Sequence, residues 1–453
     1  MCLKYKQQMK VIGSVLSFLM IALSVQAKSI HLKQNTILDK NIWESYTTFI
    51  VDDRLDLHGA SIRLPFKSTL SFTANGSINN GRIVGNSSLI KAGAWLIFDN
   101  ITIEGSWINT KVYSKWFNLA EGQASNNYLF AQLMQLCSGK QLTHFYMQKG
   151  TYYVSAIHRS APILVPSNVY WHNEATIKML PTDLEWYNIV LLNKSNNVTI
   201  DGGMFIGDVE KHKGQTGEWG HCIKCGGATN VVIKNLTCSN CWGDGIDLIE
   251  GIDKQKKPTI NCNNVTIKHV KCLNNRRQGI SIEAASNVKL INCEFAYTGF
   301  PKFTSPGAGL DIEPWTDNRN KVWNVTVIGC KLHHNKGYDI QCEPNIKKYD
   351  AFTQLHNNIS LLRSEIGTMR IQYTKGIFVR DCSITKDLLV QWTDGFELQK
   401  SRIENFKKRE KVTNIKMKNC DIKSKSNDLY CTVSLVGLAV FALVGGIKYK
   451  KVI

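Results

Sequence analysis

Acidic side chains recur within a short phrase that this chain repeats between residues 219 and 344. The copies read WGHCIKC at 219–225, WGDGIDL at 242–248, QGISIEA at 278–284 and AGLDIEP at 308–314, with a looser GYDIQCEP at 337–344. Each copy alternates apolar with polar residues, which is typical of a β-strand with one buried and one solvated face. Repetition at intervals of a few tens of residues predicts stacked coils.

Coils stacked in register would align the solvated positions into columns. One predicted column reads Lys224, Asp247, Ser281, Asp311 and Asp339, and the next reads Gly226, Ile249, Glu283, Glu313 and Gln341. Several carboxylates on one open sheet face repel each other, so their clustering points to a chemical role.

The predicted spacing of these acids fits glycosidic chemistry. Residues two apart on a strand lie ~6.6 Å apart, so Asp311 and Glu313 match an inverting pair with room for a water. Glu283 and Glu313 would lie closer, at the ~4.8 Å spacing of neighbouring strands, and such proximity raises one pKa, which suits a general acid. The candidate catalytic residues are Asp244, Asp247, Glu283, Asp311 and Glu313.

Cationic and aromatic residues beside these acids are candidates for binding substrate. Arg276 and Arg277 would pin a uronate carboxylate, and His221 shares the position of Asp244 one coil earlier, where it serves as a proton shuttle or a plain hydrogen-bonding residue. The predicted binding residues are Arg276, Arg277, His221, Trp242 and Lys224. The alternative is a solvated acidic face partly neutralised by the arginines, with the tryptophan packing a loop.

Short strands and tight turns dominate the chain. Residues 28–120 read as an N-terminal set of β-coils or a cap, and 121–429 as a solenoid of short parallel strands that opens with a helix over 125–136. A polar turn position recurs at Asn235, His269, Asn292, Gly329, Asp381 and Asn419, which predicts a structural ladder. The cysteines recur at equivalent positions, such as Cys293 and Cys330, so we expect a buried column of free thiols.

Both ends of the chain carry apolar runs. Residues 1–27 have lysines before an apolar run and a small-x-small site, which predicts a secretory signal peptide and an exported protein; an N-terminal membrane anchor is the alternative. The tail 430–453 has an apolar run followed by lysines and is expected to be a membrane segment or an end cap, so membrane contact through this tail is open.

The charge balance points to an acidic partner. Lysine and arginine number 55 against 36 acids, a formal net charge of +19. An exported basic protein suits an acidic polysaccharide. Nucleic acid is not expected as a partner, because the chain has an export signal and no recognised nucleic-acid module.

The combined pattern resembles the pectin-lyase-like superfamily of right-handed parallel β-helices over about 140–425. The resemblance rests on the coil phrases, on the helix followed by HFYMQKGTYYVS, and on NNRRQGISIEAASNVKLINCEF at 274–295 followed by AGLDIEP. It looks like a secreted bacterial branch. The resemblance implies an all-β, right-handed parallel β-helix and activities such as polysaccharide lyase, pectin-type hydrolase and epimerase, with depolymerases and non-catalytic adhesins as further members.

The motifs of the enzymes in this superfamily are incomplete here. Polygalacturonase-like hydrolases carry NTDG, a paired Asp, GHG and RIK, whereas this chain has Gln278 in place of the histidine, no adjacent Asp pair and no RIK. Acids outnumber plausible bases, so we predict a glycoside hydrolase. The alternatives are a calcium-assisted lyase that uses the arginines and a non-catalytic glycan-binding or surface protein. No metal or other cofactor is predicted for the hydrolase; calcium belongs to the lyase reading.

Overall fold

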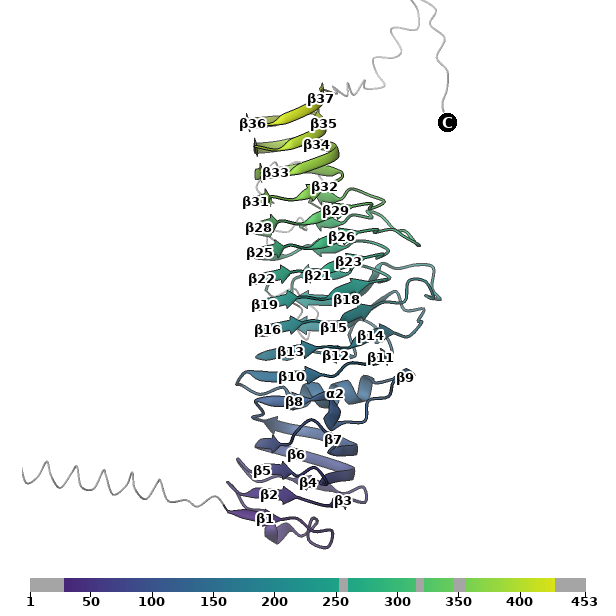
Figure 1. Ribbon diagram of the computed structural model, residues 1–453, viewed down its shortest axis with the longest axis vertical. Helices are drawn as coiled ribbons and strands as arrows, with labels where there is room; N and C mark the ends of the chain where they lie inside the picture. The colour runs from purple at the N-terminus through teal and green to yellow at the C-terminus, as the bar shows by residue number, and fades with distance from the viewer. Residues whose placement is uncertain (1–27, 252–259, 315–321, 345–355, 428–453) are drawn as a thin grey trace, which may run out of the picture.

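The protein is a long stack of β-strand coils. A computed structural model describes residues 28–251, 260–314, 322–344 and 356–427, and Figure 1 shows these coils rising along one axis from the N-terminal to the C-terminal strands. The strand pairings in these ranges are all parallel, as in β13 (Val169–Asn173) against β16 (Asn196–Asp201). The predicted signal peptide and C-terminal tail lie outside the described residues.

No helix within the described ranges is both long and apolar enough to cross a bilayer.

The N-terminal coils form a sheet system of their own. Its strands are β1 (Ser29–His31), β2 (Thr48–Val51), β3 (Arg54–Asp56), β4 (Ser61–Arg63), β5 (Thr69–Phe72), β6 (Ser77–Lys91) and β7 (Phe98–Trp107). Short 3-10 turns occupy η1 (Lys40–Ile42) and η2 (Ser114–Trp116). This region therefore consists of parallel coils like the rest of the molecule.

One helix, α2 (Asn127–Leu136), lies between the N-terminal coils and the longer stack, as Figure 1 shows. It confirms the helix predicted over 125–136. Its buried face includes Phe130, Leu133 and Leu136 and packs against β7 and β12. Gln132 Oε1 also accepts a 2.6 Å hydrogen bond from the backbone N–H of Ile103 on β7, which ties the helix to the sheet.

The longer stack has three parallel sheets. The first contains β8 (Lys111–Tyr113), β10 (Thr143–Met147), β13, β16, β19 (Thr229–Lys234), β22 (Cys262–Lys268), β25 (Ala285–Ile291), β28 (Val322–Ile328), β31 (His356–Leu362) and β36 (Val412–Lys418). The second contains β9 (Gly122–Ser125), β11 (Thr151–Val154), β14 (Thr176–Met179), β17 (Met204–Ile206), β20 (Thr237–Ser239), β23 (Lys271–Leu273), β26 (Glu294–Ala296), β29 (Lys331–His333) and β32 (Glu365–Ile366).

The third sheet carries the repeated phrases, and we call it the site sheet. It contains β12 (Ile163–Leu164), β15 (Trp186–Asn193), β18 (Trp219–Gly226), β21 (Ile246–Ile249), β24 (Ile280–Ile282), β27 (Leu310–Ile312) and β30 (Ile340–Cys342). The last coils are continuous strands that bend from sheet to sheet: β33 (Met369–Arg380), β34 (Ser383–Gln399), β35 (Arg402–Lys408) and β37 (Asp421–Asn427).

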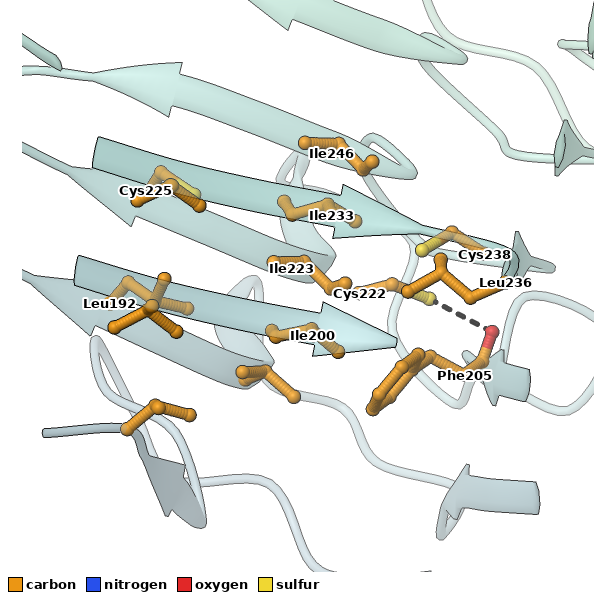
Figure 2. Packing of buried hydrophobic residues seen from close by; sticks show 14 of the residues in the cluster. Leu192, Ile200, Phe205, Cys222, Ile223, Cys225, Ile233, Leu236, Cys238 and Ile246 are labelled. Carbon is orange, nitrogen blue, oxygen red and sulfur yellow. Dashed lines mark hydrogen bonds between the residues drawn. The ribbon is translucent and has the colours of Figure 1, made fainter. Parts of the chain in front are cut away.

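Apolar side chains from all three sheets meet inside the coils. Figure 2 shows Ile200 and Ile233 of the first sheet packed near Ile223 and Ile246 of the site sheet. These side chains are fully buried, and burial of an aliphatic side chain of this size stabilises a fold by about 1.5–3 kcal/mol. Stacking repeats this contribution with every added coil.

The predicted ladder of turn residues is present. Asn235, His269, Asn292, Gly329, Asp381 and Asn419 all have positive φ. Asn235 Nδ2 donates to Asp201 Oδ1 (2.8 Å), and His269 links Asn235 to Asn292. A second ladder begins the strands of the first sheet, where Asn324 Nδ2 donates to Asn287 Oδ1 and Asn358 Nδ2 donates to Asn324 Oδ1, both at 3.0 Å. Both ladders hold coils in register through their turns.

The cysteines confirm one expectation and correct another. Ten of the described cysteines are free and all but Cys420 are buried, with Cys238 and Cys272 directly in register. However, Cys222 and Cys241 form a disulfide, so the expectation of free thiols throughout is wrong. The disulfide joins β18 to the turn after β20, two segments that packing brings together; Cys222 lies against Phe205 in Figure 2.

Replacement of Asn324 should show how much the second ladder contributes. Asn324→Ala removes both ladder hydrogen bonds and keeps an unfavourable φ of 54°, so we expect a loss of about 1–2 kcal/mol in the free energy of unfolding. Asn324→Gly should lose less, because glycine adopts positive φ freely. Urea unfolding measures both, with Gln123→Ala as the surface control. Equal losses in the free energy of unfolding for the alanine and glycine variants would show that the positive φ at position 324 has no measurable cost.

Thiol labelling should separate the disulfide from the free cysteines. In denaturant without reductant, an alkylating agent should modify Cys238 but neither Cys222 nor Cys241, and reductant should expose both. In the folded protein the buried thiols should resist labelling, since burial raises the pKa of Cys262 to about 12. Peptide mass spectrometry identifies which cysteines carry the label. Labelling of Cys222 before reduction would contradict the disulfide.

Candidate functional site

Strand register decides which polar residues share a column on the site sheet. Pairing places Lys224, Asp247, Ser281, Asp311 and Gln341 at successive equivalent positions. The predicted column is therefore confirmed up to Asp311 and wrong at its end, because Gln341 stands where Asp339 was expected. Asp339 instead accepts hydrogen bonds from the backbone N–H and the hydroxyl of Thr368 and belongs to a turn. The next column then runs Glu283, Glu313, Glu343.

The carboxylates are not on a solvated face as predicted. Asp247 and Asp311 are 1% and 0% exposed, whereas Glu283 and Glu313 are 8% and 9% exposed. The aspartates are covered because longer side chains cross over them: Lys224 Nζ lies 2.7 Å from Asp247 and Gln278 Nε2 lies 2.8 Å from Asp311. The cluster thus has a fully buried layer of aspartates and a slightly more exposed layer of glutamates.

Arg277 connects the two layers. Its Nη1 lies 3.1 Å from Asp244 Oδ2 and its Nη2 lies 3.0 Å from Glu313 Oε1. Its Nε is 3.5 Å from Glu218, whose side chain is partly exposed. The same Glu313 oxygen accepts a 2.9 Å hydrogen bond from Gln278. One guanidinium therefore offsets part of the mutual repulsion of the acids.

A smaller cluster surrounds Asp244. Ser281 Oγ donates to Asp244 (3.1 Å) and also lies 3.3 Å from Asp247, so one hydroxyl bridges two carboxyl groups. His221 Nδ1 accepts the backbone N–H of Asp244 at 3.0 Å, which leaves Nε2 3.7 Å from Asp247. His221 is therefore held in one orientation between the two acids.

These contacts separate the pKa values of neighbouring groups. Burial raises the pKa of Asp244 to about 8, against the opposing effect of Arg277. Asp247 is equally buried, but Lys224 and His221 hold its pKa below the ordinary value. Burial lowers the pKa of His221 to about 3, so its imidazole is neutral near pH 7. A protonated acid beside an ionised acid is a common arrangement in sites that transfer protons.

The pKa values of three more carboxyl groups in the cluster, Glu283, Asp311 and Glu343, are raised. Burial, together with Asp247 and Glu313, raises the pKa of Glu283 well above the usual range, and burial with Glu313 does the same for Asp311. Glu343 ends the glutamate column, and burial raises its pKa against the opposing effect of its ion pair with Arg370. Glu283 thus favours its protonated form, while Glu313 accepts hydrogen bonds from Arg277 and Gln278.

Two predicted binding residues lie away from the open face. Trp242 is 2% exposed, and its ring stacks on His212 at 3.7 Å between ring centroids. Arg276 covers that ring with its Cζ 3.8 Å from the centroid, and it donates to the carbonyl of Gly217. Both side chains pack loops above the sheet, and their contact with substrate stays a prediction.

Sequence reasoning missed three polar residues of the cluster. Gln278 stands where the hydrolase motif has a histidine, and its amide donates to both Asp311 and Glu313. The other two are Glu343 and Arg370, which form an ion pair at the end of the glutamate column. The signal for Glu343 was present, since the pair Glu313-Pro314 recurs as Glu343-Pro344, and alignment on these prolines gives the observed register.

The calcium expectation is not supported by the geometry. In the part of the chain that the structure describes, no group of three or more His, Cys, Asp or Glu side chains is arranged to hold a metal ion. The donor atoms face Lys224, Arg277 and Gln278 instead. We therefore derive no step through a metal.

Comparison with known proteins now fixes the fold. A family model described as "Right handed beta helix region" matches residues 168–320. The A-module of the mannuronan C-5 epimerase AlgE4 of Azotobacter vinelandii superposes with a TM-score of 0.50 at 11% identity, covering 70% of this chain and 97% of that module. The fold is a right-handed parallel β-helix.

Two further proteins are similar to this chain, one in structure and one in sequence. PfbA, a surface adhesin of Streptococcus pneumoniae, has a TM-score of 0.45 at 12% identity, covering 70% of this chain and 92% of that one. YclG, an uncharacterized protein of Bacillus subtilis (strain 168), is 24% identical over 356 residues, which is 68% of this chain. The chain spans 60% of the length of YclG. The family model and the AlgE4 module agree with the β-helix fold implied by the sequence.

The raised pKa of Asp244 gives a pH-dependent prediction. Its folded pKa of about 8 exceeds the unfolded value of about 3.9, so its contribution to stability is full below pH 4 and is lost as pH rises toward 8. Asp244→Asn carries no such loss. Relative to the native protein, the variant should gain stability from pH 5 to pH 7.5 by up to about 1.4 kcal/mol per pH unit.

Urea unfolding at several pH values measures this difference. Asp183→Asn, at an exposed site, is the control and should track the native protein at every pH. A constant difference between Asp244→Asn and the native protein across this range would show that Asp244 ionises normally.

Proposed function

We propose that this protein hydrolyses a polysaccharide, with Glu283 as the general acid and Glu313 as the nucleophile. The observation that carries the proposal is the contrast between these two side chains on neighbouring strands. Glu283 has a strongly raised pKa, while Glu313 receives hydrogen bonds from Arg277 and Gln278. Both are slightly more exposed, at 8% and 9%, than the neighbouring Asp247 and Asp311.

The separation of the pair favours a retaining reaction. Neighbouring strands lie about 4.8 Å apart, close to the ~5–5.5 Å between the carboxyl groups of retaining glycosidases. The inverting pair expected from Asp311 and Glu313 is less suitable, because Asp311 is buried beneath Gln278. Asp244, Asp247 and Asp311 then serve as a supporting layer that sets the electrostatics of the glutamates.

Each chemical step balances within these residues. Glu283 gives its proton to the glycosidic oxygen as the bond to the anomeric carbon breaks, and the Glu313 carboxylate bonds to that carbon. Glu283, now a carboxylate, takes a proton from water, and the hydroxide displaces Glu313. Arg277 stabilises the Glu313 carboxylate between turnovers.

A polysaccharide substrate has support from the fold. The AlgE4 module acts on mannuronan, as its name states, and the site here lies along the axis of a comparable coil. The basic charge of the chain also suits an acidic polymer. We carry over only the kind of substrate, because a likeness at this identity shows the fold alone.

β-Elimination on a uronate is the second candidate, favoured by the two cations Lys224 and Arg277 at the site. It needs an unprotonated base, however. Burial alone would lower the pKa of Lys224, but Asp247 and Glu283 raise it above the ordinary value, which keeps the amine protonated. The pKa of Arg277 is likewise raised. The protonated state of both cations therefore favours hydrolysis over β-elimination.

Substitution of the two glutamates tests the proposal. Glu283→Gln and Glu313→Gln should each lower kcat about 10²–10⁴-fold on a cleaved polysaccharide, since that is the usual loss when a positioned acid or base is removed. Substrates with an acidic leaving group need no general acid, so Glu283→Gln should retain more activity on them than Glu313→Gln. Reducing-end release measures the rate, and unchanged melting temperatures show intact folding.

Glu365→Gln, on an exposed strand position, is the matched control and should keep full activity. Full activity of both site variants would place the reaction elsewhere on the coil. Products with the absorbance of unsaturated uronates would show that the reaction is β-elimination and not hydrolysis. Binding of polysaccharides without cleavage by the native protein would leave a non-catalytic glycan-binding protein.

A further inference from the structure

A groove lies beside the site, on the first two strands of the site sheet. Its volume is about 840 Å³, and its lining includes residues of β12, of β15 and of the turns that follow them. Lys224, on the next strand, lines the groove and also forms the ion pair with Asp247. The groove therefore adjoins the carboxylate columns through one shared side chain.

The floor of the groove is apolar. Leu164 of β12 pairs in register with Leu191 of β15, which pairs with Lys224 of β18. The column that carries acids farther along the coil thus begins with leucines, and Leu164 is 51% exposed. Trp186 stands at the edge, tilted against Trp219 with 5.5 Å between ring centroids. Such a surface suits the C–H face of a sugar ring.

The rim of the groove carries three cations, Arg159, Lys194 and Lys224, and one carboxylate, Glu250. Arg159 lies over the Trp186 ring at 4.8 Å from Cζ to the centroid, and Lys224 Nζ lies 5.8 Å from the same centroid. Lys194 is exposed at the opposite turn. Neither Arg159 nor Lys194 forms an ion pair with any residue in the described ranges, so both charges are available to a ligand.

A buried polar atom on the groove wall also needs a donor. Asn188 is 1% exposed, and its Nδ2 donates to the carbonyl of Ser160 at 3.1 Å. Its Oδ1 has no hydrogen-bond partner among the described residues. A buried unsatisfied oxygen costs about 1–3 kcal/mol, and a sugar hydroxyl would satisfy it.

We propose that this groove binds the uronate residues of an acidic polysaccharide and leads the chain to the Glu283–Glu313 pair. The inference rests on the proposed function for the reaction and adds the class of substrate. Arg159 and Lys194 bind carboxylates, the leucines and Trp186 contact ring faces, and Asn188 accepts a hydroxyl. Three strand spacings separate β15 from β24, so the groove lies about 14 Å along the axis from Glu283.

The groove also accounts for how a polymer approaches an acidic cluster. Uronates are repelled by the carboxylates of the site and attracted by Arg159 and Lys194 of the groove. Binding there offsets the repulsion at the reacting bond. The polymer axis must then follow the axis of the coil, crossing the strands of the site sheet.

Direct titration of the full protein tests the groove without relying on catalysis. Hexamers of galacturonate and mannuronate, a neutral glucan hexamer and a single-stranded DNA oligomer of similar charge are titrated by calorimetry. At least one uronate hexamer should bind more tightly than the glucan and the DNA. Arg159→Gln combined with Lys194→Gln should weaken that binding at least about tenfold, because two charged contacts are lost.

A matched double variant, Arg63→Gln with Lys289→Gln, removes two exposed cations elsewhere on the coil and should bind as the native protein does. The idea is overturned by equal loss in both double variants, by no loss in either, by binding of neither uronate hexamer, or by preferred binding of glucan or DNA. If the protein cleaves a neutral polymer and this cleavage requires Glu283 and Glu313, the uronate-binding role of the groove is wrong and the proposed hydrolysis still stands.

Discussion

Parallel stacking of coils at one strand spacing is the constraint on which this structure depends. It forces equivalent residues of successive coils to lie about 4.8 Å apart, whatever their chemistry. For aliphatic residues and the asparagine ladders this repetition is favourable. For acids it is unfavourable, and Glu283 and Glu313 are brought together only because the apolar columns and the turn ladders hold the coils.

The acids tolerate this proximity because other side chains divide them into different states. Lys224 keeps Asp247 ionised, and burial keeps Asp244 protonated near neutral pH. Arg277 joins the aspartate and glutamate layers of the cluster. A buried ion pair contributes little net stability, so such an arrangement is better explained by its effect on protonation than by its effect on folding.

Charge changes sign along the site sheet. Its first strands present leucines and are flanked by the cations Arg159 and Lys194, while later strands present carboxylates, and Lys224 lies at the boundary. A linear polymer laid along the coil would meet attraction first and the reacting acids afterwards. The same outward column that gives the fold its regularity thus gives the groove and the site a common axis.

The sequence by itself determined the coils, the helix over 127–136, the turn ladder and the columns as far as Asp311, because these depend on local periodicity and turn chemistry. Tertiary structure decided the rest. The burial of Asp247 depends on the reach of Lys224 across strands, and the Cys222–Cys241 disulfide depends on a turn folding back onto β18. Asp339 was misplaced because its register is set by pairing with the neighbouring coil, which alternation along a single strand cannot specify.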